Sequence, residues 1–574
     1  MAYDLNRFTL KKSMTEQKKD EKFRVNERIE SLVKKFFKDN KITDDFKIEE
    51  NKNIKSQLIT LIEKVVKIEE QLSEKNSLIL ESIIEDDDVD TTSLSNIILI
   101  DFNSKIKSYF KSSVQNDLKL LDLFNDKKII FFLRQGIVTN IYTELFLIQT
   151  RKQLLKKYAN SSVLDPNFNK VAVSVIILLA HQCFNNEYIW NISEDEKQDI
   201  EKIKLKIEKI NKNNTKIPNG LIGLLCCYNN ISEYKILLDY FRDKKNDSIL
   251  NSLIQRQLIE IQEEEEIEKD IKSLTLIDDN ISLKVMSQYE SNPYPRWLNL
   301  TTGSKYKNYF DYIKKTLPKQ NLFAKEFEIK NVLIAGCGTG KHPIEVAKID
   351  PTLEITAIDI SKPSIAYGIR KSHEFGIKNI RWAQADILKL DEIDKKFDLV
   401  ESSGVIHHLE DPNKGFLMLD EKLKKGGFMK LGLYARNFRS SYLNDIKKYK
   451  NENQFKNDIK SIRKLRLFLI NNIENDKYQK LFKIPDIYNS SGFRDLIMHV
   501  QEHDFSIEEL DKMVSDRYNF LGFFWNKSNS IKANECFEKI NPEKSKLNIM
   551  NWDSVEKKIP EIFAGMYQFW LQKK

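Results

Sequence analysis

The stretch Asn331-Val-Leu-Ile-Ala-Gly-Cys-Gly-Thr-Gly340 decides the fold of this chain. Its first half is an apolar run suited to a buried parallel strand, and its second half places glycine at 336, 338 and 340. Glycines let a backbone turn tightly and approach a ligand closely, and the amides that open a following helix point toward that ligand. The segment therefore predicts a strand, a nucleotide-binding loop and a helix.

An acid at the end of the next apolar run predicts that the ligand carries a ribose. The run Glu354–Asp359 is expected to be a second strand, and a carboxylate at its end can bind both ribose hydroxyls. Lys341-His342-Pro343 follows the glycines, where a phosphate-binding loop would have Gly-Lys-Ser/Thr. A phosphate-binding loop is therefore not indicated.

Three more strands are expected downstream, at residues 380–384, 397–402 and 428–433. Ala385-Asp386-Ile387 follows the first of them, and Gly404-Val-Ile-His-His-Leu-Glu-Asp-Pro412 lies shortly after the second. Leu423-Lys-Lys-Gly-Gly427 precedes the third. In this order, residues 285–434 resemble the class I S-adenosylmethionine-dependent methyltransferases, in the branch with the series GCGTG, D, AD, GVxHHLxDP and LKxGG.

The resemblance implies an α/β fold with a doubly wound, mostly parallel, seven-stranded Rossmann-like sheet, preceded by an all-α domain. It implies S-adenosyl-L-methionine as cofactor, with the glycines around its methionine end, Asp359 on its ribose and Asp386 with Ile387 at its adenine. The cofactor-binding residues expected on this basis are Gly336, Cys337, Gly338, Gly340, Asp359, Ile360, Asp386, Ile387 and Ser402. A dehydrogenase is the alternative nucleotide-binding enzyme, but its Gly-x-Gly-x-x-Gly spacing differs, and it leaves Asp386 and the two histidines without a role.

The length of 574 residues predicts two or more domains. Residues 1–24 are expected to be a disordered or frayed lead-in, and residues 25–275, whose apolar positions recur at helical spacing, an all-helical domain. Residues 276–300 form a predicted linker or lid, because two prolines among aromatics at 289–297 forbid a regular helix. Residues 301–574 form the methyltransferase domain, with a helical insertion at 437–516 and a closing antiparallel pair near 518–525 and 566–571.

Composition limits the partners and the compartment. The net charge of +8 comes from 93 basic and 85 acidic residues spread along the chain, so nucleic acid is only weakly indicated as a partner. Five cysteines form no Cys-x-x-Cys pair, which indicates neither a disulfide framework nor a thiolate zinc site. No stretch has the apolar length expected of a membrane span, so we expect a cytoplasmic protein without a membrane partner.

His407 and His408 are the candidate catalytic residues. They follow the fourth strand, where the methyl group is expected to emerge, and an imidazole suits the removal of a proton from a nucleophile near neutral pH. The same dipeptide occurs in methyltransferases with different substrates. One of the two histidines can therefore serve only to pack or hydrogen-bond the loop.

A second group of histidines lies in the insertion. His499-x-x-Glu502-His503 would place two imidazoles at i and i+4 on one helical face, the arrangement of zinc in inverted metalloproteases. No third ligand is evident, so we predict no metal site and assign this helix to the acceptor pocket. The expected substrate-pocket residues are Tyr294, Tyr434, Arg436, His499, Glu502 and His503.

Taken together, these patterns predict an S-adenosylmethionine-dependent methyltransferase that acts on an O or N atom of a small molecule or of a protein or peptide. The absence of a Pro-Cys dipeptide after the fourth strand leaves no nucleophile for cytosine C5 methylation. One alternative is an RNA methyltransferase, which would show a basic channel along residues 402–442. Another is an interaction or regulatory protein whose helical half binds a protein partner.

Overall fold

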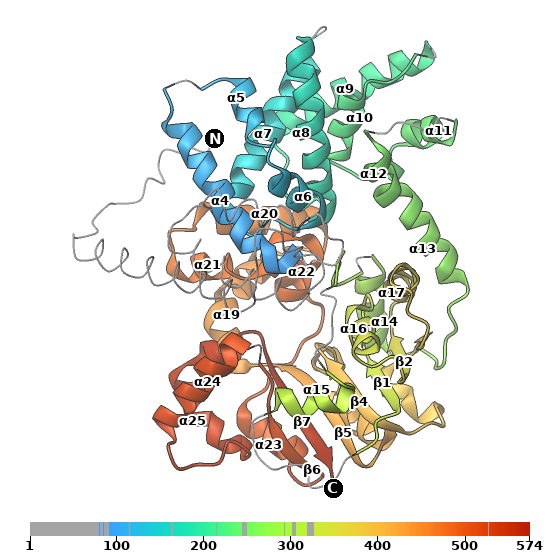
Figure 1. Ribbon diagram of the computed structural model, residues 1–574, viewed down its shortest axis with the longest axis vertical. Helices are drawn as coiled ribbons and strands as arrows, with labels where there is room; N and C mark the ends of the chain where they lie inside the picture. Colours follow the sequence, from blue (N-terminus) through green and yellow to red (C-terminus); the bar gives the residue numbers. More distant parts are fainter. Residues whose placement is uncertain are drawn as a thin grey trace, which may run out of the picture. The chain divides into compact units, whose positions relative to one another are not determined.

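The computed structural model describes Leu80, Ile84 and residues 91–574, except 114, 162–164, 214, 244–248, 292, 301–305, 318–326 and 526 (Figure 1). The predicted lead-in at 1–24 lies outside the described residues. The chain divides into two compact units, residues 1–132 and 133–574. In the first unit the described elements are helices α4 (Thr91–Lys111), α5 (Asp117–Asp122) and the start of α6 (Lys127–Gln135).

The second unit begins with a run of helices. They are α7 (Ile141–Asn160), α8 (Pro166–Asn185), α9 (Glu194–Lys212), α10 (Asn219–Cys226), α11 (Lys235–Asp243), α12 (Asn251–Ile254), the π-helix Gln255–Ile259, α13 (Glu260–Lys269) and α14 (Asn280–Ser291). Side-chain caps start the longest of them: Asn140 accepts from the first-turn amides of α7, and Ser193 forms a capping box with Glu196 on α9. The prediction of an all-helical N-terminal region is confirmed. The predicted domain boundary at 275 stays a prediction.

Helix α8 departs from the expectation that no stretch is long and apolar enough to cross a membrane. Its 20 residues pass that criterion by length and composition, with a mean hydropathy of 1.2. Within the protein, 67% of the apolar window is buried. Its buried Gln182 donates to the carbonyl oxygens of Leu133 and Gly136 at 2.8 and 2.7 Å, as expected of a core helix in a globular protein.

The C-terminal half contains a seven-stranded sheet in the order β3-β2-β1-β4-β5-β7-β6, which confirms the predicted fold class (Figure 1). Its strands are β1 (Asn331–Ala335), β2 (Glu354–Asp359), β3 (Ile380–Gln384), β4 (Phe397–Ser403), β5 (Leu423–Tyr434), β6 (Tyr518–Phe523) and β7 (Met566–Lys573). The first five pair in parallel, and β7 inserts antiparallel between β5 and β6. The carboxyl ends of β1, β2 and β4 therefore meet at one edge.

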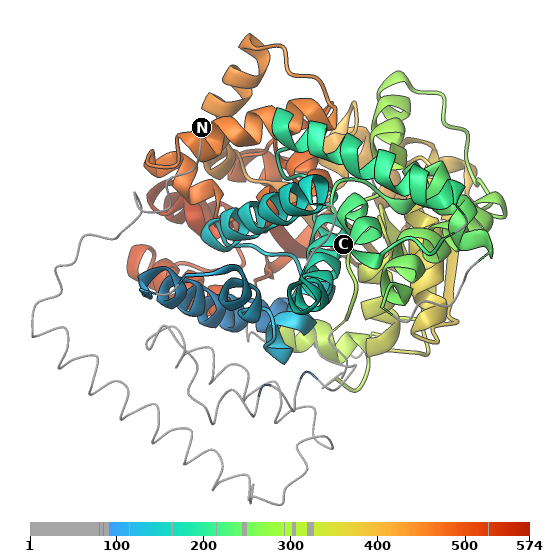
Figure 2. The same ribbon diagram turned by 90° about the horizontal axis from the view of Figure 1, so that it is seen from above.

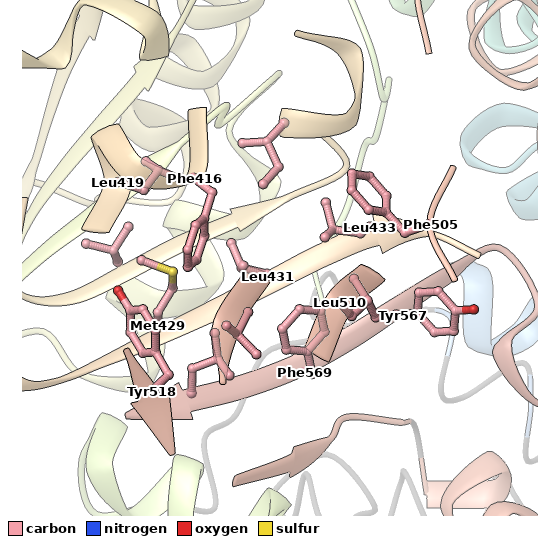
Figure 3. Close-up of a cluster of buried hydrophobic side chains, with 14 of the residues drawn as sticks. Phe416, Leu419, Met429, Leu431, Leu433, Phe505, Leu510, Tyr518, Tyr567 and Phe569 are labelled. Atoms are coloured by element: carbon pink, nitrogen blue, oxygen red, sulfur yellow. The ribbon is translucent and has the colours of Figure 1, made fainter. Parts of the chain in front are cut away.

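Successive side chains of a strand point to opposite faces of the sheet, and both faces are apolar and buried under helices. On one face Phe428 and Leu399 pack under α15 (Tyr309–Thr316), α16 (Lys341–Ile349) and α17 (Lys362–Glu374). On the other, Met429, Leu431 and Leu433 pack with α18 (Pro412–Lys422), α23 (Ile507–Val514), α24 (Lys527–Ile540) and α25 (Asp553–Lys558) (Figure 3). Ile271, from the predicted helical domain, also packs in the first of these clusters.

Between β5 and α23 the chain forms the helical insertion. It consists of α19 (Arg436–Glu452), α20 (Ile459–Asn471), α21 (Asp476–Leu481), the 3-10 helix Pro485–Tyr488, α22 (Ser490–Phe493) and the π-helix Arg494–Met498. The last helix ends before His499, which has an extended ψ of 140°. The predicted helix over His499–His503 is therefore wrong, and these side chains do not share a helical face.

The insertion lies beside helices α7 and α8 (Figures 1 and 2), and buried polar contacts join them. Arg466 on α20 donates two hydrogen bonds to the carboxylate of Glu144 on α7, each 2.6 Å long, and both side chains are buried. After α8, Glu187 accepts from the backbone N–H and hydroxyl of Ser491 at 2.6 and 2.7 Å. The N-terminal helices therefore hold the insertion in place.

Replacing Arg466 by Ala should lower the free energy of unfolding by about 3–5 kcal/mol, because it leaves the Glu144 carboxylate buried without its partner. The double variant Glu144→Leu/Arg466→Met should recover most of this loss. Urea denaturation followed by tryptophan fluorescence measures both, with exposed Lys464→Ala on the same helix as control. A loss below about 1 kcal/mol for Arg466→Ala would show that the pair does not hold the insertion.

Candidate active site

The glycine loop at the end of β1 is shaped by close backbone approaches. Gly336, Gly338 and Gly340 have φ angles of 78°, 51° and 82°, in the left-handed region that favours glycine. A Cβ on Gly338 would lie 2.7 Å from the carbonyl oxygen of Tyr294, so the segment before the sheet packs directly on the loop. The indole N–H of Trp297 donates to the Thr339 carbonyl at 3.1 Å. The lid role of this segment stays a prediction.

Asp359, at the end of β2, holds the loop in this shape. One carboxylate oxygen accepts the N–H of Gly338 at 2.7 Å, and the other accepts the N–H of Ser361 at 3.0 Å. Burial raises the pKa of Asp359, and these backbone hydrogen bonds oppose the rise by favouring the ionised form. The carboxylate predicted to bind a ribose therefore also orients the loop.

A cavity of about 560 Å³ opens at this edge of the sheet. Ten residues predicted for the site line it: Gly336, Cys337, Gly338, Asp359, Ile360, Asp386, Ile387, Tyr294, Tyr434 and His408. Seven others do not line it: Gly340, Ser402, His407, Arg436, His499, Glu502 and His503. Most of the expected cofactor residues therefore share one cavity. Of the expected substrate-pocket residues, only Tyr294 and Tyr434 line it.

The far end of the cavity fits an adenosine. Asp386 is 1% exposed, and its Oδ1 accepts the N–H of Leu388 at 2.9 Å. Its Oδ2 has no hydrogen-bond partner within the described part of the chain. A buried carboxylate oxygen without a partner is costly, and the exocyclic amine of an adenine would supply the missing donor.

The two predicted catalytic histidines occupy different places. His407 is fully buried and stacks on Tyr434, with ring centroids 3.7 Å apart. His408 lines the cavity, and its Nδ1 lies 2.8 Å from the carbonyl oxygen of Gln501. Burial lowers the pKa of His408 to about 3, so its ring is neutral at physiological pH and retains a proton poorly.

Beside the glycine loop, three tyrosines meet two carboxylates, a set we name the tyrosine–carboxylate wall: Tyr289, Tyr294, Tyr434, Asp486 and Asp495. The hydroxyls of Tyr289 and Tyr434 donate to Asp495 at 2.7 and 3.0 Å. The hydroxyl of Tyr294 donates to Asp486 at 3.0 Å. Burial raises the pKa of Asp486 to about 6, and the nearby charge of Asp495 adds to the rise.

Comparison with known proteins agrees with this geometry. Residues 327–484 match the family model described as "Methyltransferase domain". The chain is 28% identical over 200 residues to an uncharacterized protein of Synechococcus sp., covering 33% of this chain and 48% of that one. It is 33% identical over 96 residues to an uncharacterized methyltransferase of Mycobacterium bovis, covering 17% of this chain and 46% of the relative.

The chain carries a methyltransferase domain. Its cofactor is S-adenosyl-L-methionine, which the cavity between the glycine loop, Asp359 and Asp386 fits. The chain spans about half the length of the curated relatives that it matches. Among solved structures, PKMT2 of Rickettsia typhi with AdoHcy is 20% identical, with a TM-score of 0.36 over 49% of this chain and 54% of that one.

One group in the methyltransferase domain has the composition of a metal site. The ligand atoms of His408, Asp495 and His499 lie within 4.8 Å of one another. However, the rings of His408 and His499 are stacked, with centroids 3.6 Å apart and an interplanar angle of 17°. In-plane lone pairs of parallel rings do not converge on one ion, so this arrangement favours packing over metal ligation.

The remaining predicted pocket residues form ion pairs and hydrogen bonds away from the cavity. Arg436 pairs with Asp504 at 2.8 Å and with Glu509 at 2.7 Å. Glu502 pairs with Arg439 at 2.8 Å and also with Lys447. His503 bonds the Gln501 side chain at 3.0 Å. His499 lies behind the wall, with its Nε2 3.2 Å from the Tyr289 hydroxyl.

The sequence patterns missed three wall residues, Tyr289, Asp486 and Asp495, and one polar cluster. Asp486 and Asp495 sit in the insertion, and no motif marked them. Their role became visible only from contacts with Tyr294 and Tyr289, about 200 positions earlier. The cluster joins His342 and Glu401, whose Nε2 and Oε2 atoms lie 2.6 Å apart.

Replacing Asp359 by Ala should weaken S-adenosylmethionine binding by about 1.5–3 kcal/mol, because it removes charge-assisted hydrogen bonds and releases the Gly338 amide. Calorimetry on the purified chain measures this change. The control is Glu354→Ala, an exposed acid at the other end of the same strand. Unchanged affinity in the Asp359 variant, or preferred binding of a nicotinamide dinucleotide, would contradict the cofactor assignment.

Proposed function

We propose that this protein is an S-adenosylmethionine-dependent methyltransferase whose acceptor is an amine nitrogen, on a small molecule or on a protein or peptide. The observation that carries the proposal is the tyrosine–carboxylate wall. Two carboxylates and the hydroxyls of three tyrosines lie beside the cofactor loop, a combination that attracts a cationic ammonium group by charge.

The charges around the wall favour a cation over a neutral alcohol. Arg439 stacks on Tyr434 at 3.7 Å from the ring centroid, on the side occupied by Glu502. Its charge is paired there, at 2.8 Å from the Glu502 carboxylate. Asp495 lines the cavity, and Asp486 accepts the hydroxyl of Tyr294, which lines the cavity too, so the negative charge of the wall lies close to a bound ligand. A neutral alcohol would gain less from these charges than an ammonium group.

The bound cofactor supplies an electrophilic methyl group, and methyl transfer from it mainly requires positioning. The wall would hold the ammonium end of the acceptor, and the phenol hydroxyls would keep the carboxylates oriented. The segment from Tyr289 to Trp297, packed on the glycine loop, would keep water from the reacting nitrogen. The proton that leaves the ammonium group needs an acceptor.

Purified protein with methyl-labelled cofactor and matched acceptor pairs tests the proposal. The two members of a pair have the same carbon skeleton, and one ends in a primary amine and the other in an alcohol. Each member is tested as a free small molecule and as a side chain within a peptide. Label should enter the amine member only. Label entering the alcohol members, or RNA alone, would overturn the amine assignment.

Asp495→Asn should raise KM for the amine by roughly 10–100-fold with little change in cofactor affinity, because it removes a charge that faces the acceptor and not the cofactor loop. Steady-state kinetics and calorimetry on the same preparation separate the two effects. Asp476→Asn, an exposed acid on α21 in the same insertion, is the matched control. Equal KM in the two variants would remove Asp495 from the acceptor site.

The pH dependence of acceptor binding should follow Asp486. Its pKa is raised to about 6, so the carboxylate is ionised above that pH and becomes protonated as the pH falls through it. The KM for the amine should therefore rise as pH falls below about 6. Asp486→Asn should show a raised KM that no longer changes between pH 5 and 7. A low-pH rise that persists in this variant would assign the titration to another group.

A further inference from the structure

Glu401 is a buried carboxylate within the sheet. It lies on β4 opposite Ile334 of β1 and Lys430 of β5, and its side chain is 2% exposed. The hydroxyl of Tyr309, on α15, and the Nε2 of His342 each lie 2.6 Å from it, and Nζ of Lys430 lies at 3.8 Å. Burial alone would raise the pKa of Glu401, but His342 and Lys430 lower it to about 2, which keeps the group ionised.

His342 connects this carboxylate to the cavity. It stands in the first turn of α16, two residues after Gly340, and its side chain is 35% exposed and lines the cavity. An ionised Glu401 accepts a hydrogen bond from Nε2–H, which leaves the lone pair of the neutral ring on Nδ1. Among the described residues, Nδ1 of His342 has no hydrogen-bond partner.

Within the part of the chain that the structure describes, the other cavity histidine has no carboxylate within hydrogen-bond distance of its ring, since Asp495 lies 3.9 Å from it. Of the seven histidines in the chain, His342 and His408 line the cavity. The Gln501 carbonyl orients His408 at Nδ1, and Nε2 has no hydrogen-bond partner among the described residues, but burial lowers the pKa of this ring to about 3, so it holds a proton poorly. A base oriented by a third group, with a carboxylate that stabilises its charged form, is the arrangement that proton abstraction requires.

We propose that His342, oriented by Glu401 and Tyr309, is the general base that deprotonates the acceptor amine. This inference rests on the proposed function, because it takes the acceptor to be an ammonium group. The proton passes from the ammonium nitrogen to Nδ1, and the N–H bonding pair stays on nitrogen as the lone pair that then bonds the methyl carbon. The bond from that carbon to the cofactor sulfur breaks, and its electron pair stays on the sulfur, which leaves as S-adenosylhomocysteine. The resulting imidazolium is paired with Glu401 and returns its proton to solvent from the exposed part of the ring.

Charged groups on every neighbouring element surround this ring. Glu401 and Lys430 face it from the sheet, Tyr309 and Tyr312 come from α15, and Glu345 comes from α16 itself. Burial raises the pKa of Tyr309 and Tyr312, and the charges of Glu401 and Glu345 add to the rise. Neither tyrosine therefore competes as a base near neutral pH.

The test combines kinetics with a measurement on the ligand-free protein. In His342→Gln, kcat for the amine at pH 7 should fall roughly a hundredfold or more, while cofactor affinity changes less than about threefold. Activity of the variant should recover as pH approaches the pKa of the free amine, because the acceptor then arrives deprotonated. Added imidazole should partly restore His342→Ala. His373→Gln, an exposed histidine on α17, is the control.

Nitrogen-15 NMR of the ligand-free protein should show His342 protonated at Nε2, and Glu401→Gln should weaken this tautomer preference and lower kcat. A kcat for His342→Gln within threefold of the unsubstituted protein would overturn the inference. So would a loss that lies wholly in cofactor affinity, or an Nδ1–H tautomer. If the unsubstituted protein methylates no amine, the proposed function fails, and the inference fails with it. If the unsubstituted protein methylates the amine and His342→Gln does so equally well, only the role of His342 as the base is rejected.

Discussion

The hydrogen bond from the Gly338 amide to Asp359 is the interaction on which the rest of the site depends. It fixes a loop whose backbone can be this tight only with glycine, because the carbonyl oxygen of Tyr294 occupies the space of a Cβ on Gly338. The loop in turn sets where α16 begins, and with it the place of His342. One carboxylate thus orders the cofactor loop, the overlying segment and the first turn of the adjacent helix.

The acceptor side depends on a different set of contacts. The insertion that carries Asp486 and Asp495 is held by α7 and α8 through the Glu144–Arg466 ion pair and the bonds of Glu187 to Ser491. Residues 133–574 also form one compact unit. Helices α7 and α8 are therefore part of the structure that positions the wall, and this gives them a role that an independent recruitment domain would not explain.

Local sequence patterns predicted the cofactor side well, because glycine spacing, strand ends and the acids that follow them act over a few residues. All seven strands and the cavity positions of Asp359 and Asp386 were expected. The acceptor side depends on contacts between residues far apart in sequence, as in Tyr294 with Asp486, so no local pattern marked it. The i, i+4 spacing of His499 and His503 predicted a helix that is absent there, because the π-helix ends at Met498. In the sequence, His342 indicates only that the loop does not bind phosphate.

We infer that one cavity holds the cofactor and presents its reactive end to the tyrosine–carboxylate wall. A crystal structure of the protein with S-adenosylhomocysteine tests this claim most directly. We predict the ribose hydroxyls on Asp359, the adenine amine on the unpaired Oδ2 of Asp386, and the sulfur facing Tyr294 and Tyr434. A ligand with its sulfur turned away from these tyrosines, or bound outside the glycine loop, would contradict the account.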